Sequence, residues 1–169
     1  MPSNHKAGEN ALWQFSLAFY AAPGVAKALI TLQDRDGLDV NLILFALWLG
    51  LSGHRRFDRD ALAAADRAIR DIRAEIVEPL RTLRQKLKEN LDPDIQRLRE
   101  GVKTLELAAE QLVQYRLVRL APRVDSNSAR EACLADAYAN FSLYLGPTRV
   151  DAAEAQVIRQ ALEGFPGAR

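Results

Sequence analysis

The stretch Val40-Asn41-Leu42-Ile43-Leu44-Phe45-Ala46-Leu47-Trp48-Leu49-Gly50-Leu51 decides the fold of this chain. Asn41 is its only polar side chain, so a helix over 40–51 would have no polar face to turn to water. The stretch is also shorter than the roughly 20 apolar residues that a membrane-spanning helix needs. It therefore predicts the central helix of a soluble bundle, covered on all sides by other helices.

The residues before this stretch predict two shorter helices. Residues 1–10 are polar and are expected to form a flexible tail. Beyond them the apolar residues recur at helical spacing, and Pro23-Gly24 separates a first helix from a second. Asp39 stands where a side-chain cap for the apolar helix is needed. We therefore expect an N-terminal helical unit over residues 11–53.

The longest helical pattern covers residues 58–120. Its apolar residues recur in steps of three and four on both sides of a short turn before Pro93, which predicts two long helices. Pro79 should bend the first one, because it removes a backbone hydrogen bond and its ring clashes with the preceding turn. Two amphipathic helices with a short connection are expected to fold back as an antiparallel hairpin. The predicted apolar stripe of the second arm consists of Ile95, Leu98, Val102, Leu105, Ala109 and Leu112.

Residues 126–164 predict two C-terminal helices. Ser128 and Thr148 are each followed three residues later by an acidic residue, so each is placed to cap one of them. No segment of useful length alternates with the period of a strand. The expected fold over residues 1–169 is therefore an all-α single-domain helical bundle, with a buried apolar helix near 40–51 and a long antiparallel helical hairpin near 58–120.

The composition argues against several classes of protein. A net charge of +1 provides no general attraction to nucleic acid or to an anionic membrane. The single cysteine, Cys133, excludes an internal disulfide framework and fits a reducing compartment. The polar N-terminus lacks the apolar core of a signal peptide. We therefore expect a cytoplasmic protein with no transmembrane segment.

The sequence also lacks the common motifs of catalytic and cofactor sites. It contains no glycine-rich phosphate loop and no nucleophile elbow. Its two histidines, His5 and His54, are not part of a cluster with the spacing of a metal site. We therefore predict no catalytic residue, no metal and no cofactor, and we favour a protein that is not an enzyme.

A polar cluster lies where the second helix ends and the apolar helix begins. Combined with nearby aromatic residues, its amide and carboxylate groups would form the usual lining of a small-ligand site. The structural alternative is that Asp39 only caps a helix and Asn41 only satisfies buried polar groups. The possible pocket comprises Trp13, Tyr20, Gln33, Asp34, Asp39, Asn41 and Trp48.

Basic residues gather on one side of the first hairpin arm. At about 100° per residue they fall within a sector of about 120°, and acidic residues lie on the other side of the helix. Such a face would dock phosphates or an acidic protein, whereas the structural alternative is a solvated face whose arginine stems cover apolar neighbours. No aromatic residues interleave with it, which argues against nucleic acid. The predicted partner-binding residues are Arg67, Arg70, Arg73, Arg81, Arg84 and Lys88.

Four motifs carry a family resemblance over about half of the chain. They are Leu12-Trp13 with Tyr20-x-x-Pro23-Gly24-Val25, then Leu32-Gln33-Asp34-x-x-Gly37-x-Asp39-Val40-Asn41-Leu42, Leu44-Phe45-x-Leu47-Trp48-Leu49, and Val77-x-Pro79-Leu80-Arg81-x-Leu83-Arg84. The sequence thus resembles a family of small proteobacterial helical proteins that is known as a domain of unknown function. The resemblance implies a helical, cytosolic bacterial protein and supplies no catalytic residues.

Two hypotheses for the function follow. The first is a non-enzymatic adaptor that uses the basic face to contact an acidic protein or a phosphate-bearing partner. The alternative is a small-molecule-binding protein, or a minor enzyme, with its pocket between the N-terminal helices. Self-association through an exposed face of the hairpin is a variant of the first hypothesis.

Overall fold

The computed structural model describes residues 11–54, 56–122 and 129–166, and these residues form helices and connecting loops without a strand. The prediction of an all-α fold is therefore confirmed. The tail predicted over residues 1–10 lies outside the described residues. The helices are α1 (Ala11–Tyr20), α2 (Val25–Asp36), α3 (Val40–Leu51), α4 (Arg59–Ile72), the π-helical segment η1 (Arg73–Val77), α5 (Glu78–Lys86), α6 (Pro93–Val118), α7 (Arg130–Leu145) and α8 (Ala153–Glu163).

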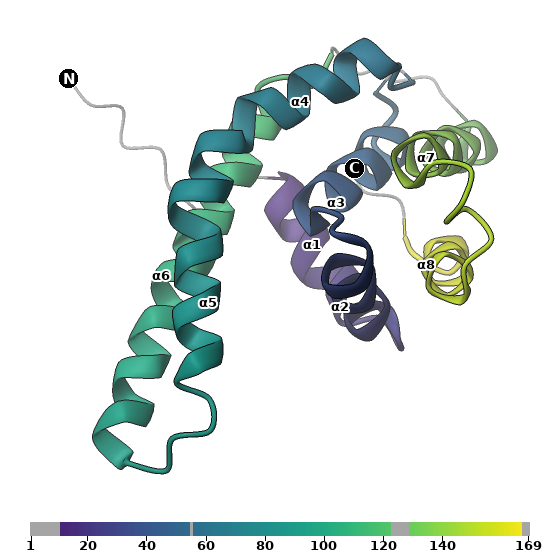
Figure 1. Cartoon of the computed structure of the whole chain (residues 1–169). Helices are drawn as coiled ribbons and strands as arrows, with labels where there is room; N and C mark the ends of the chain where they lie inside the picture. The colour runs from purple at the N-terminus through teal and green to yellow at the C-terminus, as the bar shows by residue number, and fades with distance from the viewer. Residues whose placement is uncertain (1–10, 55, 123–128, 167–169) are drawn as a thin grey trace.

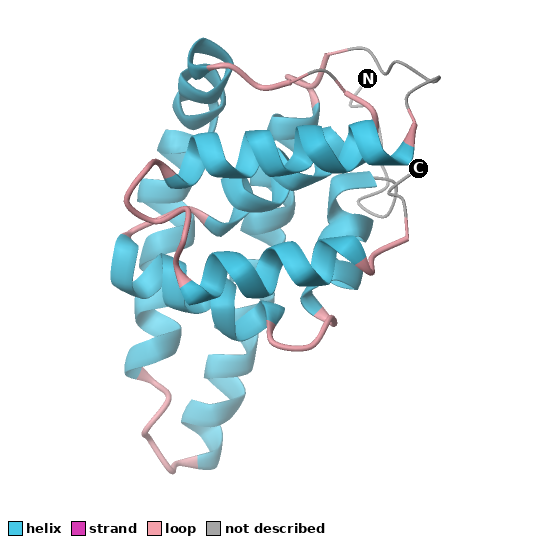
Figure 2. Ribbon diagram, turned by 90° about the vertical axis from the view of Figure 1, so that its right-hand side faces the viewer, coloured by secondary structure: helices cyan, strands magenta, loops and turns pink. Residues whose placement is uncertain are grey.

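The helices form a compact bundle with a long hairpin on one side (Figure 1). The bundle contains α1, α2, α3, α7 and α8, and the hairpin pairs α6 with the arm made of α4, η1 and α5. The tip of the hairpin projects beyond the bundle (Figures 1 and 2). Among the described residues, no single helix has the length and apolar composition to span a membrane. Helices α1 and α2 reach that length and composition only when taken together, and they are bent by 103° relative to each other.

Helix α3 lies at the centre of the bundle, as its sequence predicts. Each of its residues is buried, including Asn41, and α7 packs along it more extensively than any other helix. Asp39 caps it, because the Asp39 carboxylate accepts hydrogen bonds from the backbone N–H groups of Asn41 (2.7 Å) and Leu42 (3.3 Å). The predictions of a covered apolar helix and of its cap are both confirmed.

The first hairpin arm is interrupted just before Pro79. Proline has no N–H to donate to the carbonyl four residues earlier, and its ring would clash with that carbonyl. The backbone over Arg73–Val77 widens into a π-helical turn, which accommodates this misfit without ending the arm. The predicted disturbance is therefore present, but it takes the form of a π segment between two α-helices.

The apolar stripe predicted for α6 is only partly buried. Val102 and Ala109 lie in the core, whereas Leu98, Leu105 and Leu112 are 55%, 60% and 44% exposed. Helix α6 packs against the other hairpin arm and also against α1 and α3, so its buried side is rotated toward the bundle. The three leucines are therefore left on the outer side of the hairpin, and the prediction that they pack inside it is wrong.

The capping residues predicted for the C-terminal helices differ from those observed. Ala129 precedes α7 and Ala152 precedes α8, and neither provides a side-chain cap. Thr148 lies in the turn between the two helices, so the prediction that it caps the last helix is wrong. Ser128 lies outside the described residues.

Candidate functional site

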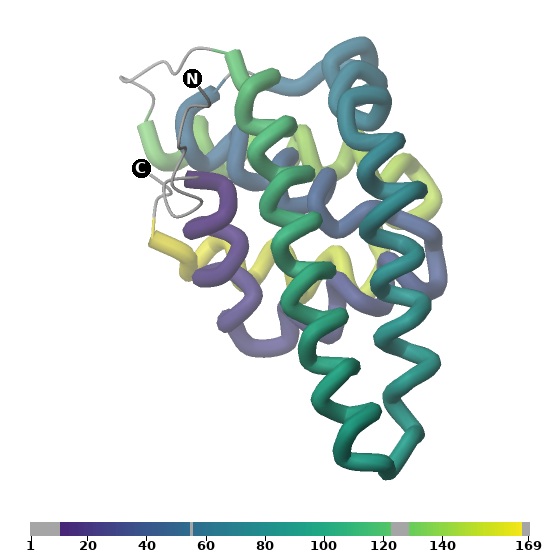
Figure 3. Tube along the Cα trace, turned by 90° about the vertical axis from the view of Figure 1, so that its left-hand side faces the viewer, coloured from purple at the N-terminus to yellow at the C-terminus, as the bar shows by residue number. Residues whose placement is uncertain are grey.

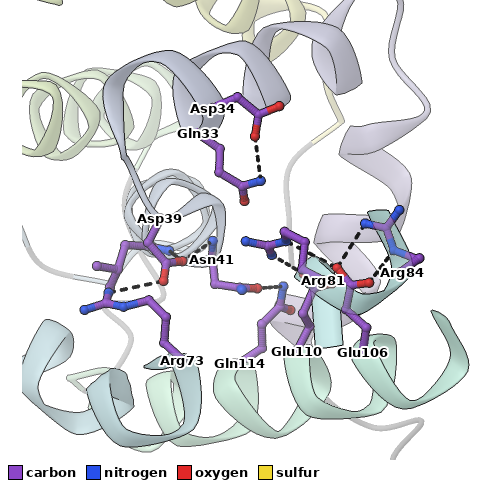
Figure 4. A network of polar contacts seen from close by, with 11 residues as sticks. Gln33, Asp34, Asp39, Asn41, Arg73, Arg81, Arg84, Glu106, Glu110 and Gln114 are labelled. Atoms are coloured by element: carbon purple, nitrogen blue, oxygen red, sulfur yellow. Dashed lines mark hydrogen bonds and ion pairs between the residues drawn. The ribbon is translucent and has the colours of Figure 1, made fainter. Parts of the chain in front are cut away.

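Two neighbouring cavities lie where the N-terminal helices face the hairpin. Their volumes are about 510 and 410 Å³, and both are lined by Gln33 of α2, Asn41 of α3 and Arg81 of α5. Figure 4 shows the side chains of these three residues directed toward the same space between the helices. The two groups of residues singled out in the sequence, the polar cluster and the basic face, therefore meet in one place.

Six of the seven predicted pocket residues line these cavities. Asp34 and Asp39 line the larger one and Trp13 and Tyr20 the smaller one, in addition to the shared Gln33 and Asn41. Trp48 lines neither cavity.

Trp48 instead packs at the far end of α3. Its ring centroid lies 6.2 Å from that of Phe45 and 4.8 Å from that of His54. It follows Asn41 by two helical turns, so it is displaced by about 10 Å along the helix axis. The placement of Trp48 beside the polar cluster is therefore wrong.

A chain of buried amide and hydroxyl groups fixes Asn41. Gln114 of α6 donates to Oδ1 of Asn41 (2.9 Å), and the Ser16 hydroxyl of α1 lies 3.2 Å from Oε1 of Gln114 and 2.8 Å from the carbonyl oxygen of Leu12. Helices α6 and α1 thus hold the Oδ1 side of the Asn41 amide, α6 directly and α1 through Gln114. Among the described residues no acceptor is found for its Nδ2 group, and Asn41 lines both cavities.

Arg73 of η1 closes the other side of the larger cavity. Its guanidinium contacts the carboxylates of Asp39 (3.2 Å) and Asp66 (2.9 Å), while the backbone N–H of Asp39 donates to the Tyr144 hydroxyl (2.8 Å). Burial opposes ionisation of Asp66, but the hydrogen bonds from Arg70 and Arg73 outweigh it and hold the pKa of Asp66 below its usual value. Asp39 therefore caps a helix and also anchors an arginine of the cavity wall.

A second ion-pair cluster lies between α5 and α6. Arg81 contacts Glu106 (3.2 Å) and Glu110 (3.0 Å), and Arg84 also pairs with Glu106 (3.1 Å for its Nη2). Glu106 is only 5% exposed, so the two guanidiniums compensate a carboxylate that is almost removed from water. Arg81, Arg84, Glu106 and Glu110 line the smaller cavity together with Tyr20. Burial raises the pKa of Tyr20 to about 12, and the charge of Glu110 adds to the shift.

These contacts divide the predicted basic face. Arg73, Arg81 and Arg84 turn inward to acidic residues, and Arg70 pairs with Asp66 while remaining largely exposed. Arg67 and Lys88 are exposed and take part in no ion pair that the described part of the chain shows. Half of the predicted docking residues therefore line the two cavities.

The acidic partners in α6 were missed in the sequence. Glu106 and Glu110 are four residues apart and so share a face of α6, and Arg81 and Arg84 are three apart on the opposing arm. Opposite charges at these spacings across a predicted hairpin could have indicated the ion pairs. The hydrogen bond from Gln114 to Asn41 had no such signal, because it depends on how the hairpin docks on α3.

The pKa of Glu110 yields a prediction about stability. Burial raises this pKa above its usual value of 4.5, against the opposing charge of Arg81. Because the folded state holds the proton more tightly than the unfolded state, this contribution to stability is present below pH 4.5 and is lost as pH rises through the raised value. We therefore expect the melting temperature of Glu110→Gln to rise relative to that of wild type as the pH increases from 4 to 8, because the uncharged glutamine has no proton to lose. A difference that is constant with pH would contradict the raised pKa.

Comparison with known proteins places the chain in a family. No curated protein and no solved structure matches it. A family model matches residues 11–117. This range includes the three residues that the cavities share and both ion-pair clusters. It ends before Tyr144. The chain therefore belongs to the family described as Protein of unknown function (DUF2390).

Proposed function

We propose that this protein binds a small metabolite in the two neighbouring cavities. The observation that carries the proposal is that both cavities share Gln33, Asn41 and Arg81, whose side chains are contributed by three different helices. Asn41 and Arg81 are already held by hydrogen bonds and ion pairs, so a ligand would meet fixed polar groups and little ordering entropy would be lost on binding.

The charges of the larger cavity favour a ligand with a positive charge. Its lining contains more carboxylates than guanidiniums, so the local field attracts a cation. A protonated amine satisfies this charge and donates hydrogen bonds to carboxylate oxygens. The carboxylates are Asp34, Asp39, Asp66 and Glu78, and the guanidiniums are Arg73 and Arg81.

The smaller cavity favours an apolar group on the same ligand. Aromatic and aliphatic side chains from α1, α2, α3 and α6 form much of its wall, as in most small-ligand sites. These side chains are Trp13, Leu17, Tyr20, Ile30, Leu44 and Leu107. The Nδ2 group of Asn41, a residue of the shared wall, can donate a hydrogen bond to an acceptor on the ligand. The proposed ligand is therefore an amine with an acceptor group and an apolar or aromatic body.

The adaptor hypothesis is the second proposal, and less supports it. An acidic partner needs guanidiniums that are free to pair, whereas Arg73, Arg81 and Arg84 already have carboxylate partners. It would have to rest on Arg67, Arg70 and Lys88. For either function we infer a cytoplasmic bacterial protein, which the low cysteine content and the resemblance to a proteobacterial family support.

Gln33→Ala tests the small-molecule proposal. Gln33 lines both cavities, and its side chain makes one long hydrogen bond, to Asp34 at 3.4 Å, so the fold depends little on it. We expect some aromatic or aliphatic amino compounds to raise the melting temperature of wild type. The same compounds should bind Gln33→Ala about five- to tenfold more weakly by calorimetry, because one hydrogen-bonding group is worth about 1 to 1.5 kcal/mol.

The chain offers a matched control for this variant. Gln156 on α8 also makes one long hydrogen bond, to the Asp151 carbonyl at 3.4 Å, and lies outside both cavities. Gln156→Ala should bind as wild type does. N-acetylated forms of the active compounds, which lack the positive charge, should not bind. The proposal fails if charged and acetylated compounds behave alike or if Gln33→Ala binds as tightly as Gln156→Ala.

A further inference from the structure

The outer side of α6 carries an exposed apolar stripe that no described helix covers. Leu98, Leu105 and Leu112 recur every seven residues and are largely exposed. Gly101 and Ala108 lie between them, so large and small residues alternate in steps of three and four along one face. A methyl group added at Gly101 would meet no atom within 4 Å, which shows that the face is open. This spacing is typical of helices that pair with another long helix.

The stripe is accessible along the hairpin. Figure 3 views the molecule from the hairpin side, where α6 and the arm formed by α4 and α5 lie in front of α3, α7 and α8. Two further exposed apolar side chains, Ile76 and Leu83, belong to the other arm of the hairpin. Because soluble monomers seldom expose long apolar stripes, this face is a candidate interface.

We propose that two copies of this chain pair through the stripe as antiparallel α6 helices. With the twofold axis between residues 106 and 107, each large residue lies opposite a small or planar one of the second copy. Leu105 then faces Ala108, Leu112 faces Gly101, and Leu98 faces Tyr115. The same pairs recur on the other side of the axis, as an isologous interface requires, and the small residues let the helices approach closely.

The charges at the ends of the stripe favour a second copy in the antiparallel orientation, in which the exposed Asp94, now paired with Arg97 of its own helix, gains a further cation. Asp94 lies at the N-terminal end of α6 and Arg119 directly after its C-terminal end, and both are exposed. In the antiparallel alignment Asp94 of each copy faces Arg119 of the other. A parallel alignment would oppose like charges at each end. The antiparallel alignment also pairs opposite ends of the two helix dipoles.

This interface leaves the proposed ligand cavities accessible. Leu107 and Glu110 of α6 line the smaller cavity, and on the helix they lie on a different side from Leu105 and Ala108. Pairing through the stripe is therefore independent of the proposed function, and each can fail without the other.

Leu105→Lys tests the dimer by sedimentation velocity over a dilution series. Wild type should sediment as a dimer that dissociates on dilution. Leu105→Lys should raise the dissociation constant about a hundredfold or more, because the substitution occurs twice in each dimer next to the axis. Leu107→Lys, on the same helix but away from the stripe, should dimerise as wild type does. Melting curves establish that each variant is folded, and Leu105 is exposed enough for lysine to be tolerated in the monomer.

Cysteine cross-linking tests the register. In a Cys133→Ala background, a Leu105→Cys chain mixed with an Ala108→Cys chain should form a disulfide between the two chains, because these positions face each other across the axis. Leu105→Cys alone should cross-link much less. A monomeric wild type, a dimer that Leu107→Lys disrupts as strongly as Leu105→Lys, or preferential cross-linking of Leu105→Cys with itself would each overturn the proposal.

Discussion

Gly50→Ala is expected to lower the free energy of unfolding by at least about 3 kcal/mol, or to prevent folding. A Cβ at Gly50 would lie 2.1 Å from the backbone nitrogen of Ala137 and 2.3 Å from its Cα. These are backbone atoms of α7, so no side chain can rotate away and α3 and α7 must separate. Because α7 packs along the buried α3, the separation would disturb the centre of the core. Urea unfolding followed by circular dichroism measures the effect.

Gly101→Ala is the matched control for this substitution. Gly101 also lies within a helix, but an added methyl group meets no atom there. Alanine should therefore stabilise α6 by up to about 1 kcal/mol through helix propensity alone. Because Gly101 belongs to the proposed dimer interface, both alanine variants are best compared in a Leu105→Lys background. Similar stabilities for the two variants would contradict the close packing of α3 on α7.

Glu106→Ala is expected to lower the free energy of unfolding by about 3–5 kcal/mol. Glu106 is buried and is the partner of both Arg81 and Arg84, so its removal leaves two half-buried guanidiniums with incomplete pairing. Arg81 would retain Glu110, whereas the described contacts give Arg84 no other direct carboxylate partner. Denaturant unfolding of the variant measures the loss.

Glu100→Ala on the same helix provides the control. Glu100 pairs with Arg99 (3.1 Å) and Lys103 (3.7 Å), but its side chain is 59% exposed. Such pairs are screened by water and contribute about 0–1 kcal/mol. If Glu106→Ala were as mild as Glu100→Ala, the arginines would not depend on Glu106, and the ion-pair cluster would not fix the wall of the cavity.

The parts of the structure that depend on local sequence could be predicted. Helix α3 is defined by its uninterrupted apolar run, and Asp39 caps it through bonds to residues only two and three positions away. The bounds of α2 follow from glycines with positive φ at both ends, Gly24 (φ 78°) and Gly37 (φ 67°). Each of these features is determined within a few residues, so a sequence pattern is enough.

The parts that depend on how distant segments pack could not be predicted. The buried side of α6 depends on where α1 and α3 pack against it. The spacing of apolar residues within α6 does not carry this information. The directions of Arg73 and Arg81 depend on carboxylates that lie elsewhere in the chain, such as Asp39 and Glu106. The sequence therefore identified the three residues that the cavities share but divided them between two separate hypotheses.

The indole resonances of the protein test the proposed ligand site most directly. The chain contains two tryptophans, Trp13 in the wall of the smaller cavity and Trp48 at the far end of α3. In a titration of ¹⁵N-labelled protein with an amino compound that raises the melting temperature, we predict a saturable shift of the Trp13 indole signal and little change of the Trp48 signal. A titration that leaves Trp13 unchanged, or that shifts only Trp48, would contradict ligand binding in these cavities.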